Sequence, residues 1–376
     1  MSRAGSESVA LPEVRVTTLE LFFDLVFVFT LTQLTALLAD RLTLEGAFQV
    51  VLIFVVLFWM YGGYAHLTNQ VPPDRDSRRL LLIMGMGAFL LCALAVPLAF
   101  AGGGVAFGLA YLGVVVVHIG LYNQLYDRRV VLRFAPLNVL AAGVVTLAGL
   151  LDTPTAYLLW LVAIAVTFLT PMLAGQVANR FDIRAVHFVE RHGLLLIVAL
   201  GESVVAIGIG IETLALDAGT FAAALVGLGI SAAMWWAYFI HDAEVAEHVM
   251  RNADADRRFR LAINAYFYAF TLMLLGVVAI AAGVKKSIGH VGEQLEPGTA
   301  IALAAGIALY LGGGAAFRLL MGLRPVAARI IAAALGLATV AVGTWVSAGA
   351  QLVTISAVLV GMLLVEAMAG RVRGTT

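Results

Sequence analysis

The chain has 376 residues, of which 62% are hydrophobic and 12% are charged, whereas an ordinary soluble domain carries roughly 25% charged residues. This composition excludes a soluble fold and suits a bilayer, whose core of about 30 Å needs about 20 apolar residues per helical span. The 23 basic and 23 acidic residues cancel, so no basic surface for nucleic acid is indicated. We therefore expect an all-α, polytopic transmembrane helix bundle.

Hydropathy over windows of about 19 residues predicts about twelve helices. The first six are expected near residues 18–38, 46–68, 80–100, 104–122, 134–151 and 156–173. The second six are expected near residues 187–210, 218–240, 259–283, 298–320, 326–348 and 350–369. Because Glu20 and Asp24 lie inside the first apolar segment, we interpret that segment as a retained helix and not as a signal peptide.

The basic residues alternate sharply between loops. Arginines follow the second, fourth and eighth predicted helices, at Arg75, Arg78, Arg79, Arg128, Arg129, Arg133, Arg251, Arg257 and Arg258. The opposite loops carry only Arg41, Lys285 and Lys286. Because short cytoplasmic loops hold the excess of Lys and Arg, we predict that both termini are cytoplasmic, which an even number of helices allows.

We predict that the chain is built from two parallel six-helix repeats. The predicted units are a cytoplasmic N-terminal segment at 1–17, a first repeat at 18–173, a cytoplasmic linker at 174–186, a second repeat at 187–370 and a cytoplasmic tail at 371–376. Parallel repeats occur in several transporter folds, where the binding site lies at the interface between the two halves.

Polar residues at matching positions support the repeat. When the segment 18–37 is laid on the segment 187–206, Gln33 falls on Glu202. The second helix of each half then ends in a histidine, which is His66 in the first half and His241 in the second.

Glu202 lies deep in the hydrocarbon, in Leu-Gly-Glu-Ser about 15 residues into the seventh predicted helix, or roughly 22 Å from its cytoplasmic end. A charged residue at the centre of a span costs about 2.5–3.5 kcal/mol, so such residues usually face a cavity or a partner and mark ion or proton paths. Gly201 beside it would let another backbone or a ligand approach closely. A structural alternative is that Glu202 hydrogen-bonds to a neighbouring helix.

Glu20 and Asp24 are four residues apart and therefore share one face of the first helix near its cytoplasmic end. They are candidates for a mouth that attracts cations. The alternative for Glu20 is that it caps the first turn, where an acid favours the helix dipole.

A second polar group opens the seventh helix at His187, Glu190, Arg191 and His192. Glu190 could pair with Arg191 or with a residue of the first helix. Two readings stay open, a titrating site and a buried ion-pair network that locks the first and seventh helices together.

His241, Glu244 and His248 would lie on one stripe if the eighth helix extends past the membrane, and they are a candidate for a divalent metal site. An exposed acid-rich helix extension is the commoner explanation. No metalloprotease, nucleophile-elbow or phosphate-binding motif is found. We therefore expect neither an enzyme nor a cofactor.

The motifs that begin at Glu20 and at His187 resemble those of the low temperature requirement protein A (LtrA) family. The matching stretches are ELFFDLVFVF running to TQLT, which begins at Glu20, and HFVERHG running to LGES, which begins at His187. The resemblance covers about residues 15–370. It implies a bacterial plasma membrane location and the motif positions Glu20, Asp24, His187, Glu190, Arg191 and Glu202.

Three functions follow as hypotheses. The first is a proton-coupled secondary transporter of an unidentified ion or small solute, in which Glu202 carries the proton and Asp24, Glu20, His187 and Glu190 form a polar path on the cytoplasmic side. The second is a passive cation channel, since Phe22-Phe23-Asp24 is similar to the Phe-Ser-Asp motif of two-times-six-helix potassium channels. The third is a membrane sensor, scaffold or intramembrane enzyme. The expected partners are the bilayer, the solute and protons, and a homo-oligomer is left open.

Overall fold

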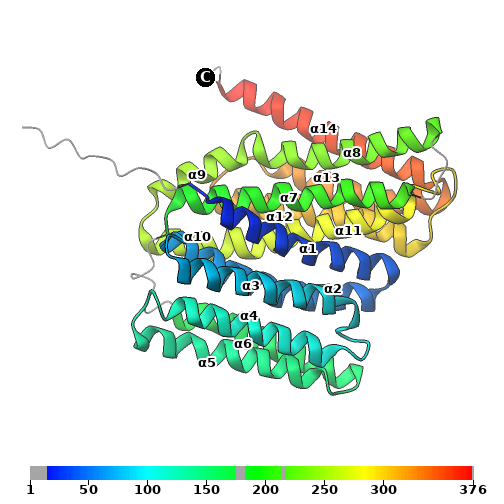
Figure 1. Cartoon of the computed structure of the whole chain (residues 1–376). Helices are drawn as coiled ribbons and strands as arrows, with labels where there is room; N and C mark the ends of the chain where they lie inside the picture. Colours follow the sequence, from blue (N-terminus) through cyan, green and yellow to red (C-terminus); the bar gives the residue numbers. More distant parts are fainter. Residues whose placement is uncertain (1–14, 175–182, 213–216, 375–376) are drawn as a thin grey trace, which may run out of the picture.

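The computed structural model describes residues 15–174, 183–212 and 217–374, and within these ranges it contains helices and no strand. The helices lie side by side in one bundle (Figure 1). Eleven helices in this part of the chain are long and apolar enough to cross a membrane, and the shorter apolar helix 153–169 adds a twelfth segment. The all-α, multi-pass membrane architecture is therefore confirmed.

The first six segments follow the predicted order. They are α1 (Thr18–Asp40), α2 (Leu44–Gln70), α3 (Asp76–Ala95) with the short 3₁₀ turn η1 (Val96–Leu98), α4 (Gly104–Tyr122), α5 (Arg128–Ala148) and α6 (Thr153–Ala174). α5 begins at Arg128, six residues before the predicted start, because long arginine side chains can extend a helix beyond the hydrocarbon core. The predicted linker 174–186 falls mostly outside the described residues.

The second six segments contain two interruptions. They are α7 (Ala185–Ile211), α8 (Ala218–Phe239) with α9 (Asp242–Asn252), α10 (Ala255–Ile263) with the π-helical turn η3 (Asn264–Ala269) and α11 (Phe270–Ser287), then α12 (Pro297–Leu320), α13 (Ala327–Trp345) and α14 (Ala348–Gly374). α14 therefore continues into the region predicted as a tail. The predicted N-terminal segment lies largely outside the described residues.

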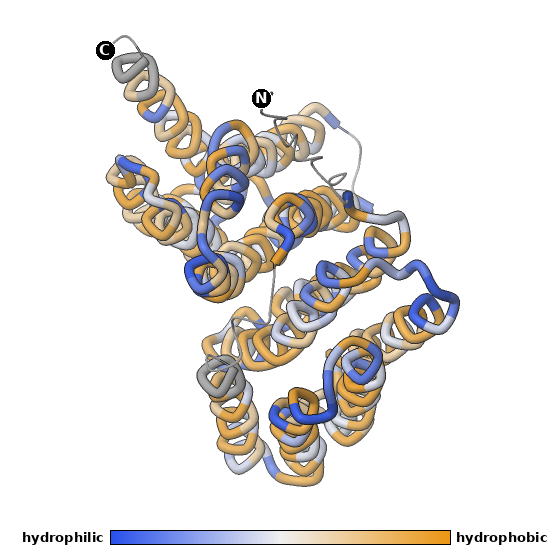
Figure 2. Tube along the Cα trace, turned by 90° about the vertical axis from the view of Figure 1, so that its left-hand side faces the viewer, coloured by the Kyte–Doolittle hydropathy of each residue, from blue (hydrophilic) through white to orange (hydrophobic). Residues whose placement is uncertain are grey.

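α1 begins and α14 ends at the same end of the bundle (Figure 1). That end faces the viewer in Figure 2, where hydrophilic residues lie at the helix ends and loops while the helices themselves are mostly apolar. The arginine-bearing turns after α2, α4 and α9 belong to this end, because α2, α4 and α9 all finish there. The cytoplasmic assignment of this end, like the internal repeat, stays a prediction.

α1 lies between the two halves. It packs against α2 and α3 of its own half and against α7 and α11 of the second half. Polar side chains on α1 and α7 can therefore meet across the interface between the halves.

Glycines let α11 and α12 approach closely. A Cβ atom added at Gly306 would lie 2.8 Å from the backbone nitrogen of Ile280 and 2.9 Å from the carbonyl oxygen of Gly276. Small residues at such crossings bring helix backbones together in membranes, where packing replaces the hydrophobic driving force.

Replacing Gly306 by valine should therefore destabilise the protein by about 1–3 kcal/mol, the usual cost of overpacking. Gly312 lies in the same helix, and a Cβ atom there would meet nothing within 4 Å, so Gly312→Val is the matched control. Thermal unfolding in detergent, followed by size-exclusion chromatography, measures both variants. An equal loss of stability in the two would contradict close packing as the reason.

Candidate functional site

Arg191 of α7 pairs with both acids of α1. Its Nη1 atom lies 3.1 Å from Glu20 Oε1 and its Nη2 atom lies 3.1 Å from Asp24 Oδ1. Nη1 also donates to the hydroxyl of Thr68 on α2, and Tyr61 of α2 donates to Asp24 Oδ1 at 2.9 Å. One guanidinium thus joins three helices from both halves.

His187 extends this cluster toward the start of α7. Its Nε2 atom lies 3.1 Å from Glu20 Oε1, and its Nδ1 atom lies 3.2 Å from the amide nitrogen of Asn69. Asn69 also receives a hydrogen bond from the backbone N–H of Arg184 and donates one to the carbonyl of the same residue, both at 2.9 Å. The end of α2 is thereby fixed to the start of α7.

Glu20 has two roles at once. Its Oε2 atom accepts hydrogen bonds from the backbone N–H and the hydroxyl of Thr17, both at 2.9 Å, and Thr17 in return accepts from the N–H of Glu20. This is a capping box. The capping interpretation of Glu20 and its pairing across the interface are therefore both correct.

The cluster of Glu20, Asp24, His187 and Arg191 is closed to solvent. Each of the four side chains is at most 1% exposed, and the guanidinium lies over the rings of Phe23 and Tyr61, 5.6 Å from each centroid. We interpret the cluster as the predicted lock between α1 and α7, which we name the α1–α7 lock.

Glu202 lies apart from this lock. It is 17 residues into α7 and nine residues before its end, or about 26 Å and 13 Å from the two ends. Its side chain is 4% exposed and accepts a hydrogen bond of 2.7 Å from the hydroxyl of Thr32 on α1. Among the described residues no Lys, Arg or His nitrogen lies within 4.0 Å of it, although Lys285 is near enough to interact electrostatically.

Most buried side chains of α1 and α7 between the lock and Glu202 are apolar. Leu31 of α1 and Leu195, Leu196 and Ala199 of α7 are each 0% exposed, and Thr30 of α1 adds one buried hydroxyl. The two polar sites are therefore separated by a mostly apolar layer of α1 and α7.

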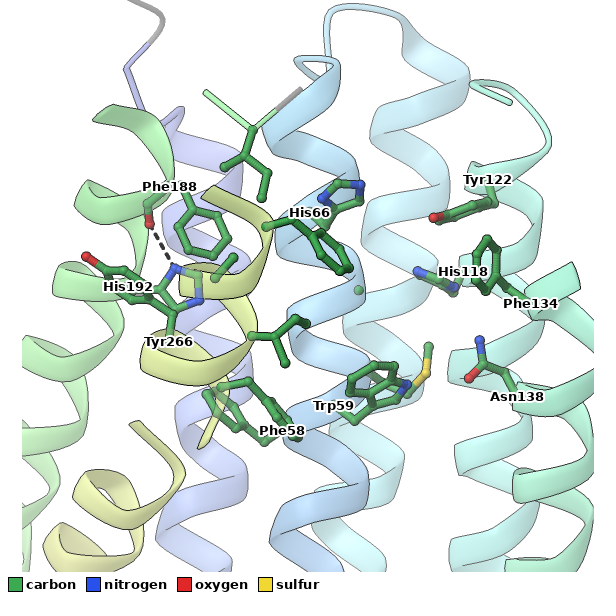
Figure 3. A pocket seen from close by; sticks show the side chains of 18 residues that line it. Phe58, Trp59, His66, His118, Tyr122, Phe134, Asn138, Phe188, His192 and Tyr266 are labelled. Atoms are coloured by element: carbon green, nitrogen blue, oxygen red, sulfur yellow. Dashed lines mark hydrogen bonds between the residues drawn. The ribbon is translucent and has the colours of Figure 1, made fainter. Parts of the chain in front are cut away.

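A cavity of about 150 Å³ opens elsewhere between the halves (Figure 3). Its walls come from α2, α4, α5, α7, α10 and η3, and aromatic side chains predominate. Three histidines line it, His66 on α2, His118 on α4 and His192 on α7. The residue Asn138 of α5 adds an amide to the wall.

The turn of π-helix at η3 shapes one wall of this cavity. It carries Tyr266 and Phe267, both of which line the cavity. Phe267 stacks on Phe58 of α2 with ring centroids 5.5 Å apart, and Tyr266 packs against His192 at 5.0 Å. Single π-helical turns occur frequently at functional sites.

A model of the bacterial low temperature requirement A protein (LtrA) family matches residues 15–364. The chain belongs to this family. It is also similar to the uncharacterized protein RA0937 of Rhizobium meliloti (strain 1021), with 28% identity over 308 residues that cover 78% of this chain and 75% of that protein.

The LtrA motif residues divide into separate groups in the structure. Glu20, Asp24, His187 and Arg191 form the α1–α7 lock, and Glu202 lies on the far side of the apolar layer. Glu190 accepts a hydrogen bond of 3.3 Å from the backbone N–H of Val16, so it pairs with neither Arg191 nor α1 itself. Among the described residues, the predicted polar path of Glu20, Asp24, His187 and Glu190 is therefore not arranged as a solvent-lined path.

The other predicted residues also have distinct positions. His192 and His66 line the cavity, and Gln33 is half-buried on α1 beside Thr32. A Cβ atom at Gly201 would meet nothing within 4 Å. Close approach of another backbone is therefore not the reason for that glycine.

The predicted metal stripe is interrupted. α8 ends at Phe239 and α9 begins at Asp242, so His241 precedes the helix that carries Glu244 and His248. His248 lies 3.1 Å from the amide of Asn252. Within the described ranges, no group of three His, Cys, Asp or Glu side chains is arranged to hold a metal ion.

The structure contains a second ion-pair cluster that was not predicted from the sequence. Arg329 of α13 pairs with Asp242 at 2.7 Å and with Glu366 of α14 at 3.0 Å, and Arg318 of α12 pairs with Glu366 at 2.6 Å. The available signal was the charge of Arg318 and Glu366 inside apolar helices. His118 and Asn138 gave no such signal, because only the fold shows that they share a cavity.

Proposed function

We propose that this LtrA protein is a proton-coupled secondary transporter of a small solute in the bacterial cell membrane, and that Glu202 is its proton-carrying residue. The observation that carries the proposal is the contrast between its buried acids. Glu20 and Asp24 each form an ion pair with Arg191 at 3.1 Å, whereas Glu202 has only a hydroxyl donor within hydrogen-bonding distance.

That contrast matters for proton exchange. A carboxylate held by a guanidinium gains little from protonation, because the proton would break the ion pair. A buried carboxyl with no cation at ion-pair distance can be stable in its neutral form, and it can bind and release a proton as its access to water changes. Glu202 also sits where α1 of one half meets α7 of the other, the usual place for a coupling site in repeat transporters.

The apolar layer favours a transporter over the cation channel. The selectivity filter of a cation channel needs polar ligands that replace the hydration shell of the ion. The side chains between Asp24 and Glu202 on α1 and α7 include the buried Leu31, Leu195 and Ala199, which supports a path that opens to one side at a time.

Chemical labelling tests the role of Glu202 without knowledge of the solute. N,N′-Dicyclohexylcarbodiimide is apolar and reacts with protonated carboxyls in apolar surroundings, so the protein in lipid vesicles should be labelled at Glu202. Peptide mass spectrometry should show less labelling at alkaline pH and none at Glu20 or Asp24. Labelling confined to the lock residues, or absent from Glu202 at every pH, would overturn the proposal.

A further inference from the structure

The aromatic cavity joins the two halves near one end of the bundle. Its rim includes Tyr122, the last residue of α4, and His66, four residues before α2 ends. Trp59 lies seven residues deeper along α2 than His66, or about 10 Å. A ligand in this cavity would therefore contact both halves and lie within reach of the aqueous end.

The lining excludes charged ligands. Among the described residues that form the walls, none is Asp, Glu, Lys or Arg. An ion transferred into such surroundings loses its hydration without gaining a counter-charge, which costs far more than the transfer of a neutral molecule. Aromatic side chains, among them Phe58, Trp59, Phe134 and Phe267, line the walls instead, and aromatic surroundings favour planar partners by offset stacking.

Two polar groups in the walls have hydrogen-bonding capacity to spare. Asn138 is 5% exposed, and its amide, which makes no hydrogen bond to any described residue, lies in the cavity wall in Figure 3. The Nδ1 atom of His192 lies 2.8 Å from the carbonyl oxygen of Phe188. Because a carbonyl oxygen only accepts, Nδ1 is the donor and Nε2 of the neutral ring is an acceptor. An amide on one half and an acceptor nitrogen on the other thus face the same space.

We propose that this cavity binds an uncharged, planar nitrogen heterocycle of pyrimidine size. Ring nitrogens and carbonyl groups of such a molecule can hydrogen-bond with an amide and an imidazole nitrogen. Aromatic side chains stack on any heterocyclic base, because every base has a π-face. A cavity of 150 Å³ in another protein holds benzene, so the volume suits one ring. If the bound heterocycle is also the transported solute, the proposal rests on the proposed function. Binding of the heterocycle in the cavity does not depend on that function.

Gly62 provides a variant that fills the cavity without disturbing its walls. A Cβ atom at Gly62, which lines the cavity, would meet nothing within 4 Å, whereas one at the neighbouring Gly63 would lie 2.7 Å from His118 Nε2. Gly143 of α5 is a matched control, because it is exposed on the outside of the bundle and has the same open surroundings. Both glycines are therefore replaced by valine.

Binding of tritiated uracil to the full chain in lipid nanodiscs tests the proposal. We expect saturable binding in the wild type and in Gly143→Val, and at least about tenfold weaker binding in Gly62→Val and in Asn138→Leu. Orotate, which is uracil with an added carboxylate, should compete at least about tenfold less well than unlabelled uracil. Unchanged binding in Gly62→Val, or equal competition by orotate, would overturn the proposal.

Two further outcomes are decisive. Absence of saturable uracil binding in folded wild-type protein, with a lipid chain recovered from the cavity, would make the cavity a lipid site and refute the heterocycle. Uracil binding by Glu202→Gln is expected to remain saturable, because Glu202 does not line the cavity. Failure at the cavity is thereby distinguished from failure of the proton-carrying role, which the carbodiimide labelling measures separately.

Discussion

Replacing Arg191 by methionine is expected to lower the free energy of unfolding by about 3–5 kcal/mol, because removal of one partner leaves uncompensated buried charges. Two carboxyls, Glu20 and Asp24, would lose their guanidinium, and both are at most 1% exposed. Unfolding in a titration with dodecyl sulfate, followed by circular dichroism, measures the change. A variant as stable as the wild type would contradict the α1–α7 lock.

Two controls separate the lock from a general effect of removing an arginine. Arg251 makes an exposed pair with Glu247, with 51% and 38% of the side chains exposed, so Arg251→Met should cost less than about 1 kcal/mol. Combining Arg191→Met with Glu20→Gln and Asp24→Asn removes the unpaired charges and should restore most of the lost stability.

Replacing Glu202 by glutamine is expected to abolish solute accumulation driven by a pH gradient. Glutamine keeps the volume and can still accept the hydrogen bond from Thr32, but it has no proton to bind or release. In proteoliposomes, accumulation of tritiated uracil against its gradient should fall to the level of empty vesicles. Exchange of uracil across the membrane without a pH gradient should persist, since exchange needs no net proton movement.

Glu212 supplies the matched control for this experiment. It follows α7 directly and is exposed, so Glu212→Gln should accumulate uracil as the wild type does. Accumulation by Glu202→Gln at the wild-type rate would contradict the coupling role. If the wild type neither exchanges nor accumulates uracil, the ligand class is wrong, and the assignment of Glu202 is then decided by the labelling experiment.

The arrangement of helices could be predicted largely from hydropathy. The bilayer selects helices of one length and one polarity, so twelve segments were found close to their observed positions. The boundaries failed where polar residues continue a helix beyond the apolar core, as at Arg128 before α5. The break between α8 and α9 and the π-helical turn η3 gave no hydropathy signal, because both lie within otherwise helical sequence.

The candidate site was only partly accessible to sequence reasoning. Charges inside apolar helices revealed Glu20, Asp24, Arg191 and Glu202, because such charges are costly and need a reason. Their separation into a paired lock and an isolated carboxyl depends on contacts between residues 167 or more positions apart. The cavity could not be predicted from the sequence, because aromatic residues and histidines such as His118 are as common in ordinary helix packing as in cavity walls.

Infrared difference spectroscopy between acidic and alkaline pH can detect the binding and release of a proton by Glu202. In wild-type protein in lipid, we expect a band from a protonated, buried carboxyl that disappears at alkaline pH and is missing in Glu202→Gln. The same band at full intensity in Glu202→Gln would show that another carboxyl, and not Glu202, exchanges the proton.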